Sequence, residues 1–364
     1  MSATVMFKCP CCGGYLEFDP GLQKFKCLYC GQVLSDADLR EQSEQREAEA
    51  EAKAAASGAV SGEGSATDSD KTPVSSLRTY HCQMCGAEIV TEETTAATRC
   101  YYCHSPVVLH DRLDEEFRPD GVIPFVLDKE AAKAKFTEFV KKKKFIDRSF
   151  FDEAQLEMFS GVYYPYWYFD VEGEAAFDGE GTRRSVATSP THIVTTTRFF
   201  RVTRQARMAF RSIARKALGK LDGKLSDGIH PFDPEGVKPY ASGYLSGFLA
   251  EKRDVEEDNV RQEMLQEVYG YADRMIRQNH SYNSLNGQAT FQASRVESRY
   301  VLLPVWVLTW KGGRDGVPYY YLMNGQTGKV CGKLPINRTK LMTWAIGAGA
   351  LVFALLCAGG KFIW

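Results

Sequence analysis

Motifs that mark several large classes of enzyme are missing from this 364-residue chain. It has no G-x-x-x-x-G-K-S/T loop, which excludes a helicase driven by a P-loop. Its six histidines are scattered, and the chain has neither an H-E-x-x-H motif nor a nucleophile elbow. Residues 1–10 contain no apolar stretch, so we expect no secretory signal peptide. These absences predict a protein that is not an enzyme and that stays in a reducing compartment.

An excess of charge of either sign is also missing. Lysine and arginine number 45 against 46 aspartate and glutamate residues, a formal net charge of −1. Nucleic-acid-binding proteins instead present a basic surface that neutralises several phosphates. Charged residues make up 25% and apolar residues 44% of the chain, which is typical of a globular protein long enough for two or three domains.

Cysteines in C-x-x-C pairs are the clearest motif that the chain does contain. Cys9 and Cys12 form one pair, and Cys27 and Cys30 form another after fourteen intervening residues. Each pair presents two thiolates from one turn, and two such turns facing each other complete a tetrahedral cage for Zn²⁺. The spacing predicts a zinc ribbon over residues 1–34.

The same arrangement of cysteines occurs again 73 positions later. It predicts a second zinc ribbon over residues 80–110 and two structural zinc ions per chain. The expected ligands of the second ion are Cys82, Cys85, Cys100 and Cys103. Because both quartets consist of cysteine alone, neither leaves the open coordination position that a catalytic zinc needs.

A few residues near the quartets leave alternatives open. Cys11 lies inside the first turn, and we expect it to be a bystander because Met84 holds the matching place in the second unit. Exchange of Cys11 for one of the ligands is the alternative. His104 follows Cys103 and could replace a thiolate, although four cysteines are already in register.

Residues 35–79 separate the two cysteine units. Ser35 and Asp38 have the pattern of a capping box, which opens a Glu-, Gln- and Ala-rich helix through about Ala56. Residues 57–76 are rich in Gly, Ser, Asp and Thr, with almost nothing to bury, and we interpret them as a flexible linker. The first unit should therefore move independently of the second.

Two helices are expected in the body, residues 111–335. The first has Asp128 as its N-cap and ends in four lysines, residues 141–144. These lysines suit the negative end of the helix dipole, and a contact with phosphate or lipid is the alternative. The second helix starts with Asp254 and Glu257 as a cap. We expect its buried stripe to consist of Val260, Met264, Val268, Tyr271 and Met275.

Strands are expected at residues 162–169, 193–202 and 300–310, which are rich in aromatic and β-branched residues. The basic segment from Arg201 to Lys224 has two interpretations. Its arginines could line one face of an amphipathic helix suited to anionic lipid, or it could continue the preceding strand into a hairpin. We favour the strand. The body is therefore expected to be α+β, with helices packed on mainly antiparallel strands.

The stretch from Leu341 to Gly360 has 20 residues and no charge. This length predicts a helix that crosses the hydrocarbon core of a bilayer, and a buried helix of a soluble protein is the alternative. Lys333, Arg338 and Lys340 precede the stretch. The positive-inside rule then places the bulk of the chain in the cytoplasm, as a tail-anchored, single-pass protein of the cell membrane.

Residues 7–14, 92–103 and 319–329 resemble those of bacterial tail-anchored double-zinc-ribbon membrane proteins. Such proteins are often labelled transcription-factor-type zinc ribbon or primosomal helicase-like proteins. The resemblance covers nearly the whole chain, including residues 244–252 and the terminal apolar stretch. It implies no catalytic residue. Some relatives are encoded beside phage-shock-type and flotillin-like membrane-stress proteins, which implies a recruiting role.

Charge bears on the choice between partners. Two zinc–thiolate centres would bring the net charge to about −5. Arg99 is the only lysine or arginine between Tyr80 and His110, where phosphate contacts would require several. We therefore expect a membrane-anchored cytoplasmic adaptor or scaffold that recruits protein partners in a membrane-stress response. The alternative is a nucleic-acid-binding zinc-ribbon protein of transcription or replication, held at the membrane.

Overall fold

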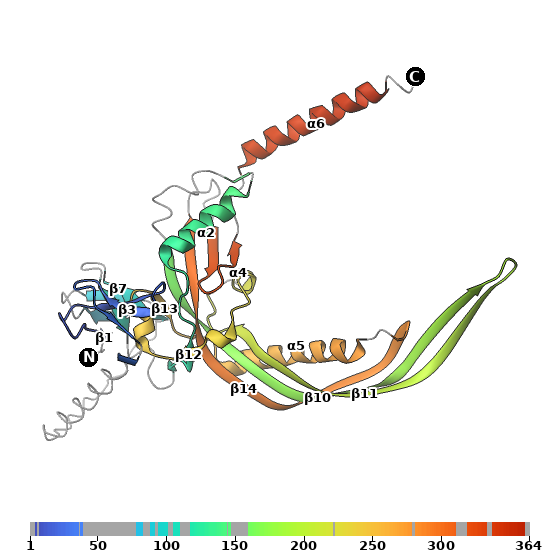
Figure 1. Cartoon of the computed structure of the whole chain (residues 1–364), viewed down its shortest axis with the longest axis horizontal. Helices are drawn as coiled ribbons and strands as arrows, with labels where there is room; N and C mark the ends of the chain where they lie inside the picture. Colours follow the sequence, from blue (N-terminus) through green and yellow to red (C-terminus); the bar gives the residue numbers. More distant parts are fainter. Residues whose placement is uncertain are drawn as a thin grey trace, which may run out of the picture.

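The computed structural model describes residues 4–5, 7–35, 37–38, 78–82, 88–91, 94–100, 105–109, 117–143, 145–146, 159–220, 223–278, 281–310, 319–332 and 337–360. The architecture is α+β with mainly antiparallel strands, as expected, and eleven of the described strands join one sheet. Figure 1 shows a cysteine-containing unit near the N-terminus, a central body, a long curved arm and a separate C-terminal helix.

The strands are β1 (Thr4–Val5), β2 (Leu16–Asp19), β3 (Lys24–Cys27), β4 (Val33–Leu34), β5 (Arg78–His81), β6 (Glu88–Thr91), β7 (Thr95–Arg99), β8 (Pro106–Leu109), β9 (Gly121–Val122), β10 (Ser160–Thr188), β11 (Ile193–Lys216), β12 (Lys238–Pro239), β13 (Leu249–Glu251), β14 (Ser284–Trp310), β15 (Tyr319–Asn324) and β16 (Val330–Gly332). The helices are α2 (Lys129–Lys141), α4 (Gly223–Gly228), η4 (Pro234–Gly236), η5 (Ser242–Leu245), α5 (Glu257–Arg277) and α6 (Arg338–Gly360). The main sheet has the order β1-β8-β7-β13-β10-β14-β15-β16, with β11 beside β10 and β9 beside β14.

The body is the part of this sheet that is covered on both faces. On β14, Leu302 belongs to the apolar cluster that includes α2, whereas its neighbours Val301 and Leu303 belong to the cluster that includes α4. Successive strand residues point to opposite faces. Helix α2 therefore covers one face and α4 with the loop after it covers the other, which explains why this stretch of β14 is apolar without alternation.

Helix α2 begins as expected and buries one apolar face. The Asp128 side chain accepts a hydrogen bond from the Ala131 backbone N–H at 2.7 Å. Phe136 and Val140 are buried, and the Phe136 ring lies edge-on to Tyr321 with 4.5 Å between ring centroids.

Helix α5 differs from the expectation at its start and along its buried face. Its N-cap is Glu256, while Asp254 accepts a hydrogen bond from the Gly219 N–H at 2.7 Å. Tyr271 and Met275 are 49% and 54% exposed, so their placement in the core was wrong. The residues that are buried are Met264, Val268, Ala272 and Ile276. The small Ala272 is buried, whereas the larger Tyr271 beside it was expected in the core.

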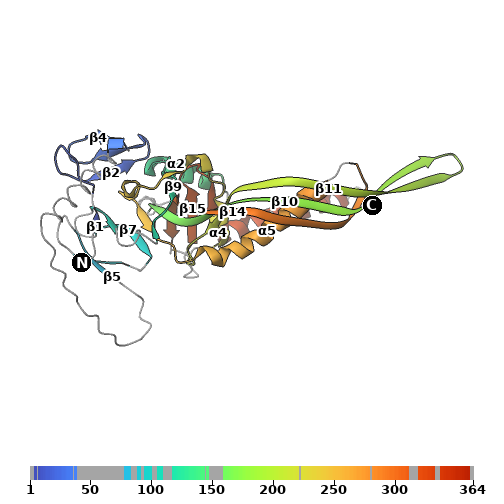
Figure 2. The same ribbon diagram turned by 90° about the horizontal axis from the view of Figure 1, so that it is seen from below.

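The arm consists of residues 170–188 of β10, 193–212 of β11 and 284–298 of β14. β10 is its central strand and pairs antiparallel with both neighbours. With 29 residues at about 3.3 Å each, β10 is about 95 Å long. Figure 2 shows the arm projecting from the body with α5 alongside its strands. Phe177 of β10 and Ile276 of α5 are buried together, so the helix stiffens one face of the arm.

The segment from Arg201 to Lys224 is a strand up to Lys216, as favoured, and the amphipathic helix is wrong. Four of its arginines form ion pairs with carboxylates of β10 or α5: Arg201 with Asp178, Arg207 with Glu174, Arg211 with Glu172, and Arg215 with Glu267. Exposed pairs of this kind add little stability. They do balance the positive charge locally, so this strand does not present a purely basic surface.

The first cysteine unit is packed against the body, contrary to the expectation of independent motion. The rings of Phe18 and Phe25 lie 5.2 and 5.6 Å from the ring of Tyr244 in η5. Ser246 donates its hydroxyl hydrogen to the Leu16 carbonyl at 2.5 Å, and its own carbonyl accepts from the Phe18 N–H at 3.1 Å. The expected linker at residues 57–76 lies outside the described residues, and its composition carries no information about this contact.

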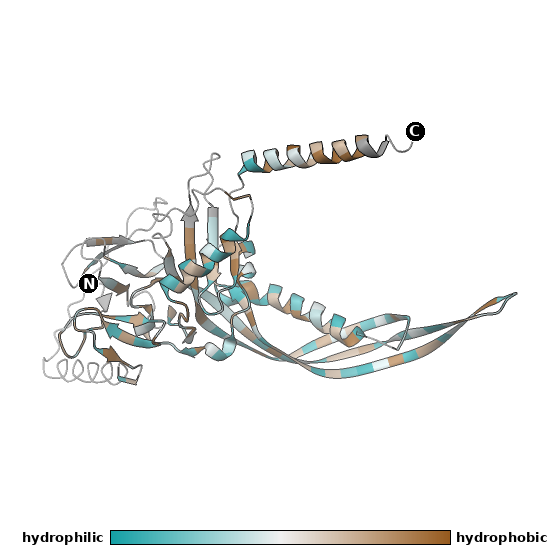
Figure 3. Ribbon diagram, turned by 45° about the horizontal axis from the view of Figure 1, so that its top comes forward, coloured by the Kyte–Doolittle hydropathy of each residue, from teal (hydrophilic) through white to brown (hydrophobic). Residues whose placement is uncertain are grey.

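Helix α6 is long and apolar enough to cross a membrane. Thr339–Cys357 has a mean hydropathy of 1.8 and is 0% buried. The alternative of a helix buried in a soluble core is therefore wrong. Figure 3 shows hydrophobic residues along most of α6 after a hydrophilic start. Asn337 caps this start, because its side-chain oxygen accepts from the Lys340 N–H at 3.0 Å.

Candidate metal centre

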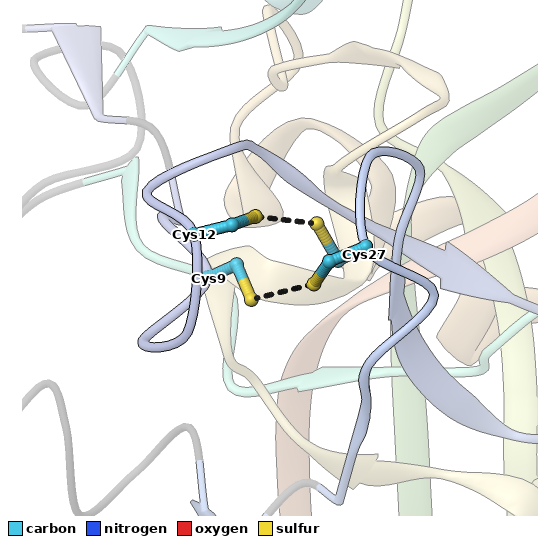
Figure 4. Close-up of side chains that lie close together, drawn as sticks. Cys9, Cys12 and Cys27 are labelled. Atoms are coloured by element: carbon cyan, nitrogen blue, oxygen red, sulfur yellow. Dashed lines mark hydrogen bonds between the residues drawn. The ribbon is translucent and has the colours of Figure 1, made fainter.

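The side chains of Cys9, Cys12, Cys27 and Cys30 bring their sulfur atoms within 4.8 Å of one another. Cys9 Sγ and Cys30 Sγ are 3.6 Å apart, and Cys12 Sγ and Cys27 Sγ are 3.5 Å apart. Figure 4 shows the side chains of Cys9 and Cys12 pointing toward the facing turn, which carries Cys27. A disulfide would require about 2.05 Å. A tetrahedron with Zn–S bonds of about 2.3 Å has edges of about 3.8 Å, so these four thiols can hold one metal ion.

Two turns of similar shape position these cysteines. Gly13 donates its N–H to the Cys9 carbonyl at 2.9 Å, and Gly31 donates to the Cys27 carbonyl at 3.0 Å. Both glycines have positive φ, 71° and 76°. A side chain disfavours this conformation, so glycine lets each turn close around its pair of sulfur atoms.

The thiols differ in their readiness to lose a proton. Burial raises the pKa of Cys9, but backbone N–H groups of its own turn and the neighbouring thiols lower it to about 7. For Cys30 a backbone N–H lowers the pKa, yet the other three thiols raise it to about 12. Four thiolates therefore repel one another. A divalent cation at their centre removes that repulsion, which is why such a cluster favours a bound metal.

The second unit repeats the backbone pairing of the first at the same offset of 73 positions. In the first unit Lys8 pairs with Tyr15, Phe25 with Leu34 and Lys26 with Val33. The corresponding pairs in the second unit are His81 with Glu88, Thr98 with Val107 and Arg99 with Pro106. The turn also recurs, since the Cys27 N–H donates to Gln32 at 2.8 Å and the Cys100 N–H donates to Ser105 at 2.9 Å. The two units are therefore structural repeats.

Two of the four expected ligands in the second unit are described. Cys82 and Cys100 are buried in one apolar cluster with Tyr80 and Ile89. Cys85, Cys103 and His104 lie outside the described residues. Ser105 Oγ lies 3.4 Å from Cys82 Sγ, a contact that the cysteine spacing does not predict.

Comparison with curated sequences gives one relative. The chain is 32% identical over 262 residues to the uncharacterized protein YdjG of Bacillus subtilis (strain 168). The match spans 70% of this chain and 76% of that protein. The chain belongs to the YdjG family. No family model matches it, and no solved structure matches it.

In this YdjG-family chain, the three cysteines outside the two quartets are described, and none of them is part of the four-thiol cluster. Cys11 is exposed and is not part of the cluster, which agrees with a bystander. Cys331 is half-buried beside α4, with Sγ 3.8 Å from the Lys224 carbonyl. Cys357 lies in α6.

One basic residue links the two units. Arg99 Nη1 lies 3.1 Å from Glu17 Oε1 of the first unit, and Arg99 Nη2 donates to the Gly247 carbonyl at 2.9 Å. The only lysine or arginine in the sequence between Tyr80 and His110 therefore contacts groups of this same chain.

Proposed function

We propose that this protein is a membrane-anchored adaptor that recruits protein partners on the cytoplasmic side and carries one structural zinc ion in each cysteine unit. The proposal includes membership of the bacterial tail-anchored double-zinc-ribbon membrane proteins and a role in the response to membrane stress. The observation that carries it is the combination of four thiols close enough to hold one metal ion and an unburied helix, Thr339–Cys357, that is long and apolar enough to cross a membrane.

The ligand set supports zinc in a structural role. Four thiolates at tetrahedral separations are typical of structural zinc sites. The first unit has only three short strands, and its buried residues such as Leu16 and Phe25 belong to the same apolar cluster as those of the body. In so small a unit the free energy of metal binding is largely the free energy of folding.

The arm supports a protein partner over a nucleic acid. Three of its arginines, Arg201, Arg207 and Arg211, form ion pairs with carboxylates, as described above. Among the described strands β11 pairs only with β10, so its outer edge offers backbone groups to which a partner strand can add. Near the tip Ile193 and Phe199 are 71% and 65% exposed, which gives such a partner apolar side chains to cover.

Deleting the tail tests the anchor and the recruitment separately. We expect a chain that ends at residue 336 to become soluble after cell fractionation with a high-salt wash, and to capture the same proteins as the detergent-solubilised full chain. A second variant replaces residues 183–198 with an Asn-Gly turn, which shortens the arm at the Thr182–Phe199 pair. This variant should remain in the membrane and lose the captured proteins.

Two results would contradict the proposal. If the chain ending at residue 336 still sediments with membranes, α6 is not the anchor. If the variant with the shortened arm captures every protein that the full chain captures, the arm does not recruit them. Sequence-selective DNA or RNA binding at physiological salt would favour the nucleic-acid alternative.

A further inference from the structure

The lysines at the end of α2 lie beside the start of α6. The Asn337 N–H, just before α6, donates to the Phe145 carbonyl, just after α2, at 2.8 Å. The rings of Phe145 and Trp344 are edge-on, with 6.2 Å between centroids. Figure 1 shows the end of α2 close to the start of α6. The lysines at this end are exposed, namely Lys141, Lys142 and Lys143.

This end of α6 is the place where a spanning helix would meet the cytoplasmic face of the bilayer. Trp344 lies in its early part, and tryptophan is enriched at the level of the lipid headgroups. Lys340, the third residue of α6, is a fourth lysine at this end of the helix. The contact between Phe145 and Trp344 therefore holds the end of α2 at the depth where lipid phosphates lie.

We propose that Lys141, Lys142, Lys143 and Lys340, the juxtamembrane lysines, bind the phosphate-bearing headgroups of anionic lipids at the cytoplasmic surface. The inference rests on the proposed membrane span of α6. Lysines next to a spanning helix are attracted to anionic headgroups, and the attraction increases with each charge.

The local interactions of these lysines do not account for all of their charge. The dipole of α2 favours a cation in its last turn, which is the position of Lys141 alone. Lys142 Nζ lies 2.8 Å from Glu138 Oε1, but both side chains are about two-thirds exposed, so water weakens the pair. Lys143 Nζ lies 5.2 Å above the Phe139 ring, which leaves its hydrogen-bond donors available for a phosphate.

The test titrates the full chain in detergent micelles with phosphatidylglycerol or with phosphatidylcholine of the same acyl chains. Native mass spectrometry counts the bound lipids. We expect the wild-type chain to prefer phosphatidylglycerol, and K141Q/K142Q/K143Q to lose about fivefold in affinity per lysine, about a hundredfold in total. The matched control K8Q/K24Q/K26Q removes three exposed lysines from the first cysteine unit and should keep the wild-type preference.

Three outcomes of this titration would overturn the inference. The first is equal lipid binding by the wild-type chain and K141Q/K142Q/K143Q, and the second is an equal loss in the control. The third is displacement of phosphatidylglycerol by inorganic phosphate at constant ionic strength, which would indicate a site for free phosphate. Alkaline carbonate extraction tests the span itself. Release of the wild-type chain from membranes would overturn both the span and this inference. A wild-type chain that stays in the membrane but shows no preference for phosphatidylglycerol would overturn this inference alone and leave the anchor intact.

Discussion

The two cysteine units share one strand register but are joined to the body in different ways. The first keeps β2, β3 and β4 in a sheet of its own and contacts the body through side chains such as Phe18 and Tyr244. In the second, β7 and β8 are part of the main sheet, where Ala97 of β7 pairs with Ala250 of β13. A repeated register therefore does not fix how a unit is built into a protein. The difference predicts that loss of metal will affect the two units unequally.

Replacing Cys100 with serine should have the largest effect. Cys100 is completely buried, and its unit shares backbone hydrogen bonds with the main sheet. We expect loss of one zinc ion and a fall of about 5–10 °C in the melting temperature of the body. The matched change Cys27→Ser should remove the other zinc ion and leave that melting temperature within about 2 °C. Elemental analysis and calorimetry would measure both, and equal shifts or bound iron would contradict the expectation.

Replacing Tyr244 with alanine should detach the first unit without removing its metal. The Tyr244 side chain is 1% exposed and packs against two rings of that unit, so its loss should cost about 3–5 kcal/mol. Limited proteolysis should then cut near the unit while elemental analysis still finds two zinc ions. The control Tyr320→Ala changes a tyrosine that is 44% exposed and should leave the cleavage pattern unchanged. A cleavage pattern like that of the wild type would show that other contacts suffice.

Replacing Gly287 with alanine should weaken the arm and leave both cysteine units intact. A Cβ at Gly287 would lie 2.4 Å from the Asp178 carbonyl oxygen and 2.5 Å from Gly179 Cα, so the strands would have to separate. We expect a loss of about 1–3 kcal/mol, visible as faster hydrogen exchange in β10 and α5. Gly270→Ala in α5 is the control. Its Cβ would meet only Arg274 at 3.8 Å, and it should slow exchange because alanine favours helix.

Replacing Arg99 with glutamine should have the smallest effect, because the ion pair that it forms with Glu17 is partly exposed to water. Their side chains are 43% and 17% exposed. We expect a loss of about 0.5 kcal/mol in unfolding free energy, weaker still at high salt. A denaturant titration at two salt concentrations would measure it. A loss of several kcal/mol would mean that Arg99 is the main link between the units.

The local elements were predictable because their signals are local. The capping box at Ser35 forms as expected, with Ser35 and Asp38 exchanging hydrogen bonds. The turn after β15 is equally local, with the Asn324 side chain accepting from the N–H groups of Gln326 and Thr327. In each case side chains a few residues apart decide the conformation.

The arm and the docking of the first unit were not predictable from the same signals. Residues 170–188 contain Gly, Asp and Glu, which strands disfavour, and they are held in a strand by pairing with β11 and β14 on either side. The Phe18–Tyr244 contact joins residues far apart in sequence. Such partners are set by tertiary packing, which neither periodicity nor spacing encodes.

The first strand of the chain has a practical consequence for engineering. β1 precedes the first cysteine unit but pairs with β8 of the second, Thr4 with Leu109 and Val5 with Val108. β1 is therefore the outermost strand at one end of the main sheet. A reporter domain fused before Thr4 would burden this edge of the sheet.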